Sequence, residues 1–263
     1  MTTREPKEPT FISILGRAFN ILEQLLMSED PIGVSELSRK TGIPKANTFR
    51  IVKTLEDLNA ITPEGSGYVL GNKMIELGAG AKKNNQFLSL TDPFLSKLSE
   101  TCGETVNLGI SFRDSILIIQ TKLSEQRLLV ASLPPITPLY CSSIGKIFLA
   151  QKTDSELKAY FKATQPRKRT VHTKVTPEQF LQERETIRSE KISHDQEEYD
   201  YGLSCMAAPI FLNNQLAAAI SISGPTSRLQ FKGYPQLEKA LKATADALSD
   251  ELTHKGATLP DIY

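Results

Sequence analysis

Cationic and amide side chains gather in one short stretch of the sequence, between residues 34 and 59. From Ser35 to Lys53 there are five Lys or Arg residues and one acidic residue, Glu36. Such side chains neutralise phosphate groups, and the release of counterions from duplex DNA supplies most non-specific affinity. The formal net charge of the whole chain, +1, does not decide the matter, because a DNA-binding protein can confine its positive charge to one face.

Two short helices are expected to position these side chains. Val34 to Lys40 fits a first helix, and Gly42 permits a tight turn after it because glycine lacks a Cβ. A second helix begins at Pro44, where the N–H that proline lacks would have no partner within the helix. The apolar stripe of the second helix is Ile51, Val52, Leu55 and Leu58. This arrangement predicts a helix-turn-helix in a major groove. The residues expected to bind DNA are Ser35, Lys45, Ala46, Asn47, Phe49, Arg50 and Lys53.

An ordinary helical hairpin with a solvated face would show the same two helices. The segment that follows favours DNA binding, because residues 60–62 and 68–70 fit two short strands around a turn at 63–67. Such a hairpin is the wing of a winged helix-turn-helix.

Side chains that could perform catalysis are also present: Cys141, Cys205, His172, His194, Asp195, Glu197 and Glu198. The thiols with the imidazoles could be nucleophile and base, and the carboxylates could be acid and base. However, no residue lies in a nucleophile motif, the adjacent glutamates would point to different faces, and free cysteines are more often simply buried. The three cysteines form neither a disulfide framework nor a metal-ligand pattern with histidine. We therefore expect that the protein is not an enzyme and that it binds no metal and no cofactor.

The composition is that of a globular protein, with 40% hydrophobic and 23% charged residues among 263. That length suffices for one large or two ordinary domains. The sequence contains no apolar run of about eighteen residues, and its start lacks the apolar core of a signal peptide. We therefore expect a cytoplasmic protein that does not enter a membrane.

The chain divides into five parts. Residues 1–10 are expected to be a disordered arm and 11–71 the winged helix-turn-helix. The apolar stripe within 11–28 is too wide for one small domain to cover; it contacts a second subunit or is buried within its own domain. Residues 72–90 are expected to be a linker helix weakened by Gly78 and Gly80. Residues 91–255 form a second domain, opened by Asp92 as helix cap and Pro93 in the first turn, and 256–263 form a tail.

The second domain combines strands with surrounding helices. Strands are expected at 105–112, 115–123, 127–133, 204–212 and 216–223. Helices are expected at 141–151, 154–163, 178–191, where Thr176 caps and Pro177 takes the first position, and about 235–254. Strands in the middle of the domain with helices around them predict an α+β class with one antiparallel sheet.

Four motifs, in this order, resemble the IclR family of transcriptional regulators, and the resemblance covers nearly the whole chain. The first is the winged helix-turn-helix. Residues 138–146, PLYCSSIGK, are similar to the family's P-L-H-x-[ST]-A-x-G-K. Residues 194–210 are similar to its D-x-E-E…G-[LV]-x-C-[IL]-A-x-P-[IV] signature, and residues 221–225, SISGP, match its S-[IV]-S-G-P ending.

The resemblance implies a GAF-like effector-binding domain, a small organic acid as ligand, operator DNA as partner, and homodimers or homotetramers. The family's effector pocket maps to Ser143, Ile144, Gly145, Asp195, Leu203, Cys205, Ser221 and Ser223. The chemistry is suitable, because a helix N-terminus offers free N–H groups to a carboxylate. Hydroxyls two residues apart on a strand also point to the same face.

Three departures from the family pattern bear on what the protein binds. Tyr140 stands where the family often has His, and Ile144 stands where a smaller Ala is usual, which narrows the pocket. The motifs are more like those of the sugar-acid (2-keto-3-deoxygluconate) regulators than those of the aromatic-acid regulators, which remain the alternative. The recognition helix keeps only the ends, Lys45 and Arg50, of the family's K-[ST]-T-[VA]-x-R, so the operator sequence does not follow from it.

Overall fold

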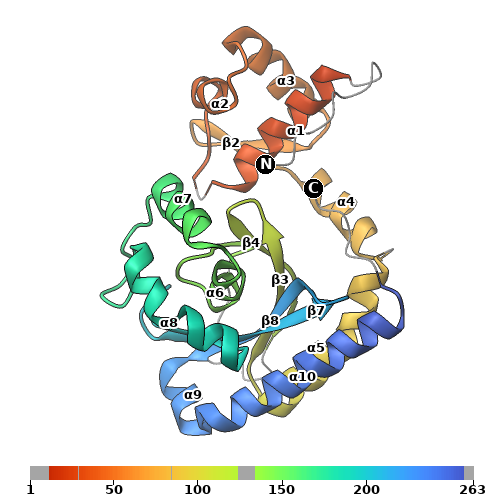
Figure 1. Ribbon diagram of the computed structural model, residues 1–263. Helices are drawn as coiled ribbons and strands as arrows, with labels where there is room; N and C mark the ends of the chain where they lie inside the picture. Colours follow the sequence, from red (N-terminus) through yellow and green to blue (C-terminus); the bar gives the residue numbers. More distant parts are fainter. Residues whose placement is uncertain (1–11, 29, 84, 124–133, 258–263) are drawn as a thin grey trace. The chain divides into compact units, whose positions relative to one another are not determined.

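The structure, a computed structural model, describes residues 12–28, 30–83, 85–123 and 134–257 (Figure 1). The chain forms two compact units, 1–84 and 85–263, which we describe separately. The expected arm at 1–10, the expected strand at 127–133 and most of the expected tail lie outside the described residues. Within them, no helix is long and apolar enough to cross a membrane.

The N-terminal unit is a winged helix-turn-helix followed by one more helix. Its elements are α1 (Ser13–Leu26), α2 (Val34–Thr41), α3 (Lys45–Asp57), β1 (Ile61–Glu64), β2 (Gly67–Leu70) and α4 (Asn72–Lys83). Gly42 ends α2 with a φ of 70°, a left-handed conformation that glycine adopts without strain. The two strands pair antiparallel, with Ile61 opposite Leu70, and form the expected wing.

The core of this unit lies between α1, α2 and α3. Ile21, Leu37 and Val52 have no exposed surface, and Leu25 and Leu55 are buried beside them. One residue of the expected stripe is misplaced: Leu58 is 60% exposed. The reason is that α3 ends at Asp57, so Leu58 caps the helix instead of continuing its buried face.

The C-terminal unit is built on a six-stranded antiparallel sheet in the order β5-β4-β3-β8-β7-β6. The strands are β3 (Thr105–Phe112), β4 (Ser115–Lys122), β5 (Ile136–Pro138), β6 (Ser193–Gln196), β7 (Leu203–Leu212) and β8 (Gln215–Pro225). The helices are α5 (Gln86–Cys102), α6 (Ser143–Ala150), α7 (Asp154–Thr164), α8 (Pro177–Glu190), α9 (Thr226–Lys232) and α10 (Tyr234–His254). The expected α+β class is confirmed.

Helices cover both faces of this sheet (Figure 1). Met206 and Ile220 belong to the core shared with α5 and α10, whereas Ala207 and Ala219 belong to the core shared with α6, α7 and α8. This alternation follows from the period of two along a strand. Because Ser221 lies two residues after Ala219, it too faces α6.

Some elements differ from the sequence expectation. The helix expected to open at Asp92 and Pro93 begins at Gln86 instead, because the Asn85 side chain accepts a hydrogen bond from the Leu88 N–H at 3.1 Å; Pro93 lies inside α5. The four-residue strand β6 and the short helix α9 are not among the elements expected from the sequence. Residues 136–138, for which the sequence predicts no strand, form the edge strand β5.

Candidate functional site

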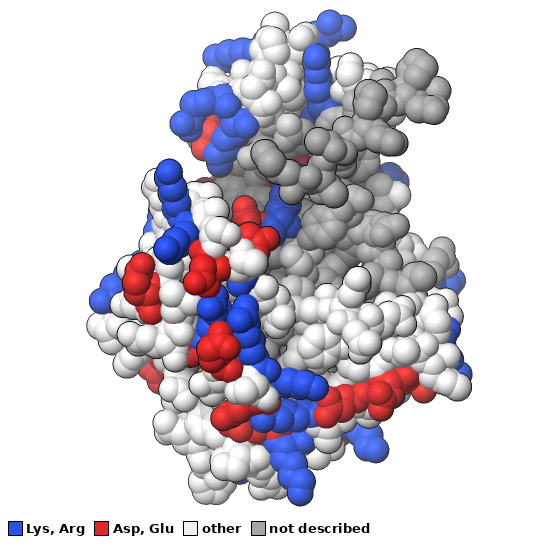
Figure 2. Space-filling view, in the orientation of Figure 1, with Lys and Arg blue, Asp and Glu red and all other residues white. Residues whose placement is uncertain are grey.

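The residues expected to bind DNA lie on α2 and α3. Six of the seven are exposed and Asn47 is half-buried. Lys45, Ala46, Phe49 and Lys53 follow one another at helical spacing on a single outer face of α3. Lys and Arg side chains are prominent over these helices on the visible face of the unit (Figure 2). The structure therefore brings most of the expected residues onto one cationic surface.

Ion pairs partly neutralise that surface. Lys53 Nζ lies 2.8 Å from Glu56 Oε2, and Lys40 Nζ lies 3.4 Å from Glu36 Oε1. Within the described residues, Lys45 and Arg50 form no ion pair, so their charges are available to phosphate groups or base edges.

A groove of about 680 Å³ runs between α1, α3 and α4 of the same unit. Its apolar lining includes Leu15, Phe19, Leu58 and Leu77, whose exposed fractions lie between 58% and 65%. Arg50 also lines it, at the boundary with the cationic surface. Part of the apolar stripe of the first helix, at Ile21 and Leu25, is buried in the core of the unit. The rest, including Leu15 and Phe19, is not covered by the described residues of this unit.

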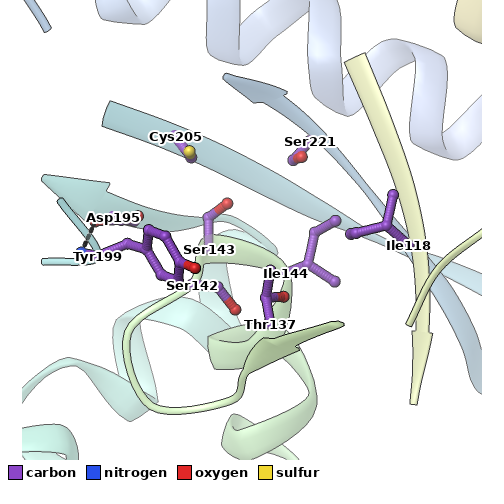
Figure 3. A pocket seen from close by; sticks show the side chains of 9 residues that line it. All are labelled: Ile118, Thr137, Ser142, Ser143, Ile144, Asp195, Tyr199, Cys205 and Ser221. Carbon is purple, nitrogen blue, oxygen red and sulfur yellow. Dashed lines mark hydrogen bonds between the residues drawn. The ribbon is translucent and has the colours of Figure 1, made fainter. Parts of the chain in front are cut away.

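The C-terminal unit contains a small enclosed cavity of about 10 Å³ between α6 and the sheet (Figure 3). Five of the eight residues expected in the effector pocket line it: Ser143, Ile144, Asp195, Cys205 and Ser221. Four further residues complete the lining: Ile118, Thr137, Ser142 and Tyr199.

The N-terminus of α6 supplies donors to this cavity. Ser142 Oγ caps the helix by accepting from the Gly145 N–H at 3.1 Å, and it donates to the Pro138 carbonyl at 2.6 Å. The Gly145 N–H therefore already has a hydrogen-bond acceptor within the protein. The amides of Ser143 and Ile144 have no partner among the described residues, and a helix N-terminus with free amides favours an anion.

Three of the expected pocket residues lie outside the lining. At position 145 a Cβ would lie 2.5 Å from Leu139 Cα, so Gly145 allows α6 to pack closely against the preceding chain. Leu203 begins β7 opposite Pro225. Ser223 faces the same side as Ser221, as expected, but its Oγ accepts from Asn107 Nδ2 at 3.3 Å.

Two buried hydroxyls in the lining lack hydrogen-bond partners. Ser221 Oγ and Thr137 Oγ1 are shielded from solvent, and neither has a partner in the part of the chain that the structure describes. Leaving a buried polar group unpaired costs roughly 1–3 kcal/mol. Together with the two free amides, these hydroxyls form a polar site that fits a small acceptor-rich molecule.

Asp195 forms the opposite wall of the cavity. Its Oδ1 accepts from the backbone N–H groups of Glu198, at 2.7 Å, and Tyr199, at 3.2 Å; the latter bond is drawn in Figure 3. Burial, and secondly the charge of Glu198, raise the pKa of Asp195 to about 7. A carboxyl group with such a pKa changes charge in the physiological range.

Behind Asp195 lies a cluster of two lysines and two glutamates, of which Lys146 and Glu198 are buried. The Lys146 side chain has no exposed surface and its Nζ lies 2.6 Å from Glu198 Oε1 and 3.0 Å from Glu183 Oε2. Lys174 contacts the same two carboxylates at 3.3 and 2.7 Å. Burial alone would lower the pKa of Lys146, but the two glutamates outweigh it, so the pKa is raised. The cluster joins α6 and α8 to the turn after β6, whose backbone N–H groups at Glu198 and Tyr199 donate to Asp195.

The thiols are poorly suited to nucleophilic catalysis. Burial, with Asp195 second, raises the pKa of Cys141 to about 12, and the same causes raise the pKa of Cys205 well above its usual value. A thiol with a raised pKa is protonated and unreactive. His194 Nε2 lies 3.0 Å from Glu238 Oε1. The described residues contain no cluster of metal-ligating side chains.

Comparisons with known proteins agree with this architecture. The model of the IclR helix-turn-helix domain matches residues 15–65, and that of the bacterial transcriptional regulator IclR C-terminal matches residues 80–250. The chain is 32% identical over 250 residues to the HTH-type transcriptional regulator KdgR of Dickeya chrysanthemi, covering 94% of this chain and 82% of that one. It is 31% identical over 250 residues to KdgR of Escherichia coli, covering 94% and 95%.

A solved structure shows the same fold. The crystal structure of Thermotoga maritima IclR is similar with a TM-score of 0.63 at 27% identity, and the alignment covers 92% of this chain and all of that one. The matched domains and relatives are regulators of transcription and not enzymes. The chain therefore belongs to the IclR family of transcriptional regulators.

Proposed function

We propose that this regulator binds operator DNA through α2 and α3, and that a small hydroxylated carboxylic acid bound in the cavity beside α6 controls this binding. The carrying observation is the cavity itself, where free helix-terminal amides and partnerless hydroxyls meet. DNA binding also implies a location in the cytoplasm, where bacterial chromosomes lie. The recognition surface is the exposed face of α3 with Ser35 on α2.

The arrangement of polar groups favours a hydroxylated acid. The carboxylate of the ligand would accept from the amides of Ser143 and Ile144 and from the hydroxyls of Thr137 and Ser221. Asp195 would repel a ligand that carries only negative groups, but it accepts from ligand hydroxyls. Two observations support a keto or sugar acid as the effector. The motifs resemble those of regulators of the 2-keto-3-deoxygluconate type, and the sequence is 32% and 31% identical to two proteins named KdgR.

A thermal-shift screen of the whole protein tests the effector class. Ligand at a hundredfold excess over Kd adds about 2.7 kcal/mol of stability, so a sugar acid or keto acid should raise the melting temperature clearly. A response confined to aromatic acids would favour the alternative effector class. The absence of any response to all three classes would contradict an acid effector.

Substitutions on α3 should separate base reading from charge neutralisation. Arg50→Ala is expected to weaken binding to an operator selected from a random pool by about 1–3 kcal/mol, because an arginine that reads a base edge contributes that much. The double variant Lys45→Ala, Lys53→Ala should lower affinity for all sequences and reduce the salt dependence. Gel-shift titrations at two salt concentrations measure both effects. Lys73→Ala, on α4, is the matched control. Unchanged DNA binding in an Arg50→Ala, Lys53→Ala variant would contradict the assignment of α3 as the DNA-binding helix.

The groove on the N-terminal unit supports a homodimer. A regulator with one recognition helix per chain needs two copies to read a symmetric site, and exposed apolar surface of this kind is where the second copy would dock. We expect a mass of at least twice the 29.1 kDa of one chain in light scattering at micromolar concentration. Phe19→Lys should shift the equilibrium toward the monomer, whereas Phe231→Lys, at an exposed position of the other unit, should not. A wild-type protein that is monomeric at this concentration is incompatible with the proposal.

A further inference from the structure

Three hydroxyl side chains surround the turn between α2 and α3. Ser38 and Thr41 lie on α2, and Thr48 lies near the start of α3. Each of them forms a hydrogen bond with the backbone of Ile43, the middle residue of the turn. The turn is therefore fastened by side chains from both of the helices that it connects.

The carbonyl of Ile43 joins the two helices directly. It accepts from Ser38 Oγ of α2 at 2.6 Å and from Thr48 Oγ1 of α3 at 3.1 Å. The Ile43 N–H donates to Thr41 Oγ1 at 3.3 Å, and Thr41 Oγ1 in turn donates to the Leu37 carbonyl at 2.7 Å. Both backbone polar groups of Ile43 are thus bonded to side chains of the flanking helices.

Thr48 is the buried member of this group. It has no exposed surface, although it lies on the helix whose outer face carries the cationic residues. Its hydroxyl has a second acceptor, the Pro44 carbonyl, at 3.3 Å. Burying a hydroxyl without a hydrogen bond is unfavourable. The hydroxyl of Thr48 therefore favours the placement of α3 in which it reaches these two carbonyls.

Apolar packing alone does not fix the start of α3 as closely. Ile51 and Leu55 anchor the later turns of the helix in the core of the unit. Hydrophobic burial is non-directional, whereas a hydrogen bond weakens steeply when its angle becomes poor. Pro44, the residue before the helix, provides no side-chain cap. The hydroxyls of Ser38 and Thr48 therefore set the position of the first turn of α3.

We propose that Ser38 and Thr48 are positioning residues for sequence recognition, which hold the first turn of α3 where its outward side chains reach base edges. The inference rests on the proposed binding of DNA through α2 and α3. In a helix-turn-helix, the N-terminal residues of the second helix contact base edges in the major groove, and Lys45 belongs to that turn. Contacts to phosphate groups tolerate small displacements, because Coulombic attraction varies slowly with distance. Loss of the two hydroxyls should therefore reduce discrimination between sequences more than affinity for DNA.

The test measures this discrimination with the whole protein. An operator is selected from a random pool with the wild type, and gel shifts at one salt concentration give the Kd for this operator and for a random duplex of equal length. The ratio of the random-duplex Kd to the operator Kd should fall roughly tenfold in Ser38→Ala, Thr48→Val, about the loss of one good base contact. The affinity for the random duplex should stay that of the wild type, because Lys45, Arg50 and Lys53 are unchanged. Thr48→Ser, which keeps a hydroxyl, should keep the wild-type ratio.

The double variant Ser28→Ala, Thr101→Val is the matched control. Ser28 Oγ donates to the Asp30 carbonyl at 2.7 Å, and Thr101 Oγ1 donates to the Lys97 carbonyl of α5, four residues earlier, at 2.7 Å. This control loses the same two types of hydroxyl at positions outside the helix-turn-helix. Its ratio should equal that of the wild type, and a fall as large as that of the first double variant would contradict the positioning role.

Two further results would overturn the inference, and they differ in what else they overturn. A folded Ser38→Ala, Thr48→Val variant with the wild-type ratio, or with both affinities lowered equally, would show that the hydroxyls only stabilise the fold, and DNA binding through α3 would stand. If this variant does not fold, Thr48→Val alone decides in the same way, with a fall of about threefold expected. If the wild type binds the operator no more tightly than the random duplex, the positioning role and the proposed recognition surface are both wrong.

Discussion

Substitution of Lys146 by methionine is expected to lower the free energy of unfolding of the C-terminal unit by roughly 3–5 kcal/mol, because it removes the buried partner of the buried Glu198 carboxylate. The partly exposed Lys174, at 3.3 Å, would be the remaining cation beside that carboxylate among the described residues. Glu198 is 3% exposed and Lys146 not at all, so water cannot replace the lost ammonium group. Methionine retains most of the volume, which separates this electrostatic loss from a packing defect. Urea denaturation of the whole protein, followed by circular dichroism, measures the change.

Lys174→Met is the matched control for this experiment. Its ammonium group binds the same two carboxylates, but the side chain is 30% exposed, so its loss should cost no more than about 1 kcal/mol. A second substitution, Glu198→Gln, should recover part of the stability in the Lys146→Met background and reduce it in the wild type. Equal losses from the two lysine variants would show that burial does not govern this cluster.

The second large effect concerns Asp195 and pH. The pKa of this carboxyl is about 7 in the folded protein against 3.8 ordinarily, so the folded state retains a proton that the unfolded state has released. The stability that the folded protein has with a neutral Asp195 carboxyl is fully present below about pH 4. It is lost as the pH rises through about 7, where the buried carboxyl ionises. Asp195→Asn keeps an oxygen for the two backbone amides and never ionises. The variant should gain stability relative to the wild type with rising pH, by roughly 2–4 kcal/mol between pH 4 and 8.

The same substitution should change anion binding. Several ionisable groups surround Asp195: Glu198, Lys146, Tyr199, Cys141 and Cys205. The pKa of Asp195 is raised to about 7, whereas the pKa values of Lys146, Cys141 and Cys205 are raised from values that already lie above 7. Formate should therefore bind the wild type more tightly at pH 6 than at pH 8, and Asp195→Asn should bind with little pH dependence. Asp200→Asn changes an exposed carboxylate on the turn that follows β6. It is the control and should keep the wild-type profile.

A pH profile in Asp195→Asn as steep as that of the wild type would assign the titration to another group. Melting temperatures measured from pH 4 to 8 test the predicted change in stability, and calorimetry with formate tests the predicted change in binding. The two tests are independent, since the first requires no ligand.

The regular parts of the fold could be predicted because local signals agree there. Val106, Leu108 and Ile110 of β3 recur at every second position and enter the core shared with α5 and α10. The Arg113-Asp114 turn marks the boundary with β4. The start of α8 was predicted correctly because Thr176 and Pro177 form a capping pattern that needs no tertiary partner. Such signals lie within a few residues of the elements they define.

The misplaced and missed elements depend on distant contacts. Asp92 and Pro93 have the form of a helix start, yet Asp92 binds Lys122 of β4 at 2.7 Å, and the helix begins about two turns earlier, at Gln86. The strand β6 consists of polar residues and exists because it pairs with β7, Asp195 lying opposite Cys205. Neither fact is visible in the local sequence.

The candidate site shows the same division. Ser143, Ile144, Asp195, Cys205 and Ser221 lie in segments with a family pattern, and all five line the cavity. Thr137 and Tyr199 were missed because one belongs to a three-residue edge strand and the other to a turn. The partnerless hydroxyl of Thr137 is a signal that only coordinates reveal.

The start of α6 is shared between the protein and whatever binds there. Ser142 satisfies the Gly145 amide, and the amides of Ser143 and Ile144 await acceptors that the described chain does not provide. The protein thus supplies half of this helix cap, and in the proposed function the bound acid supplies the other half. The order of the first turn of α6 would then increase with the concentration of that acid in the cell.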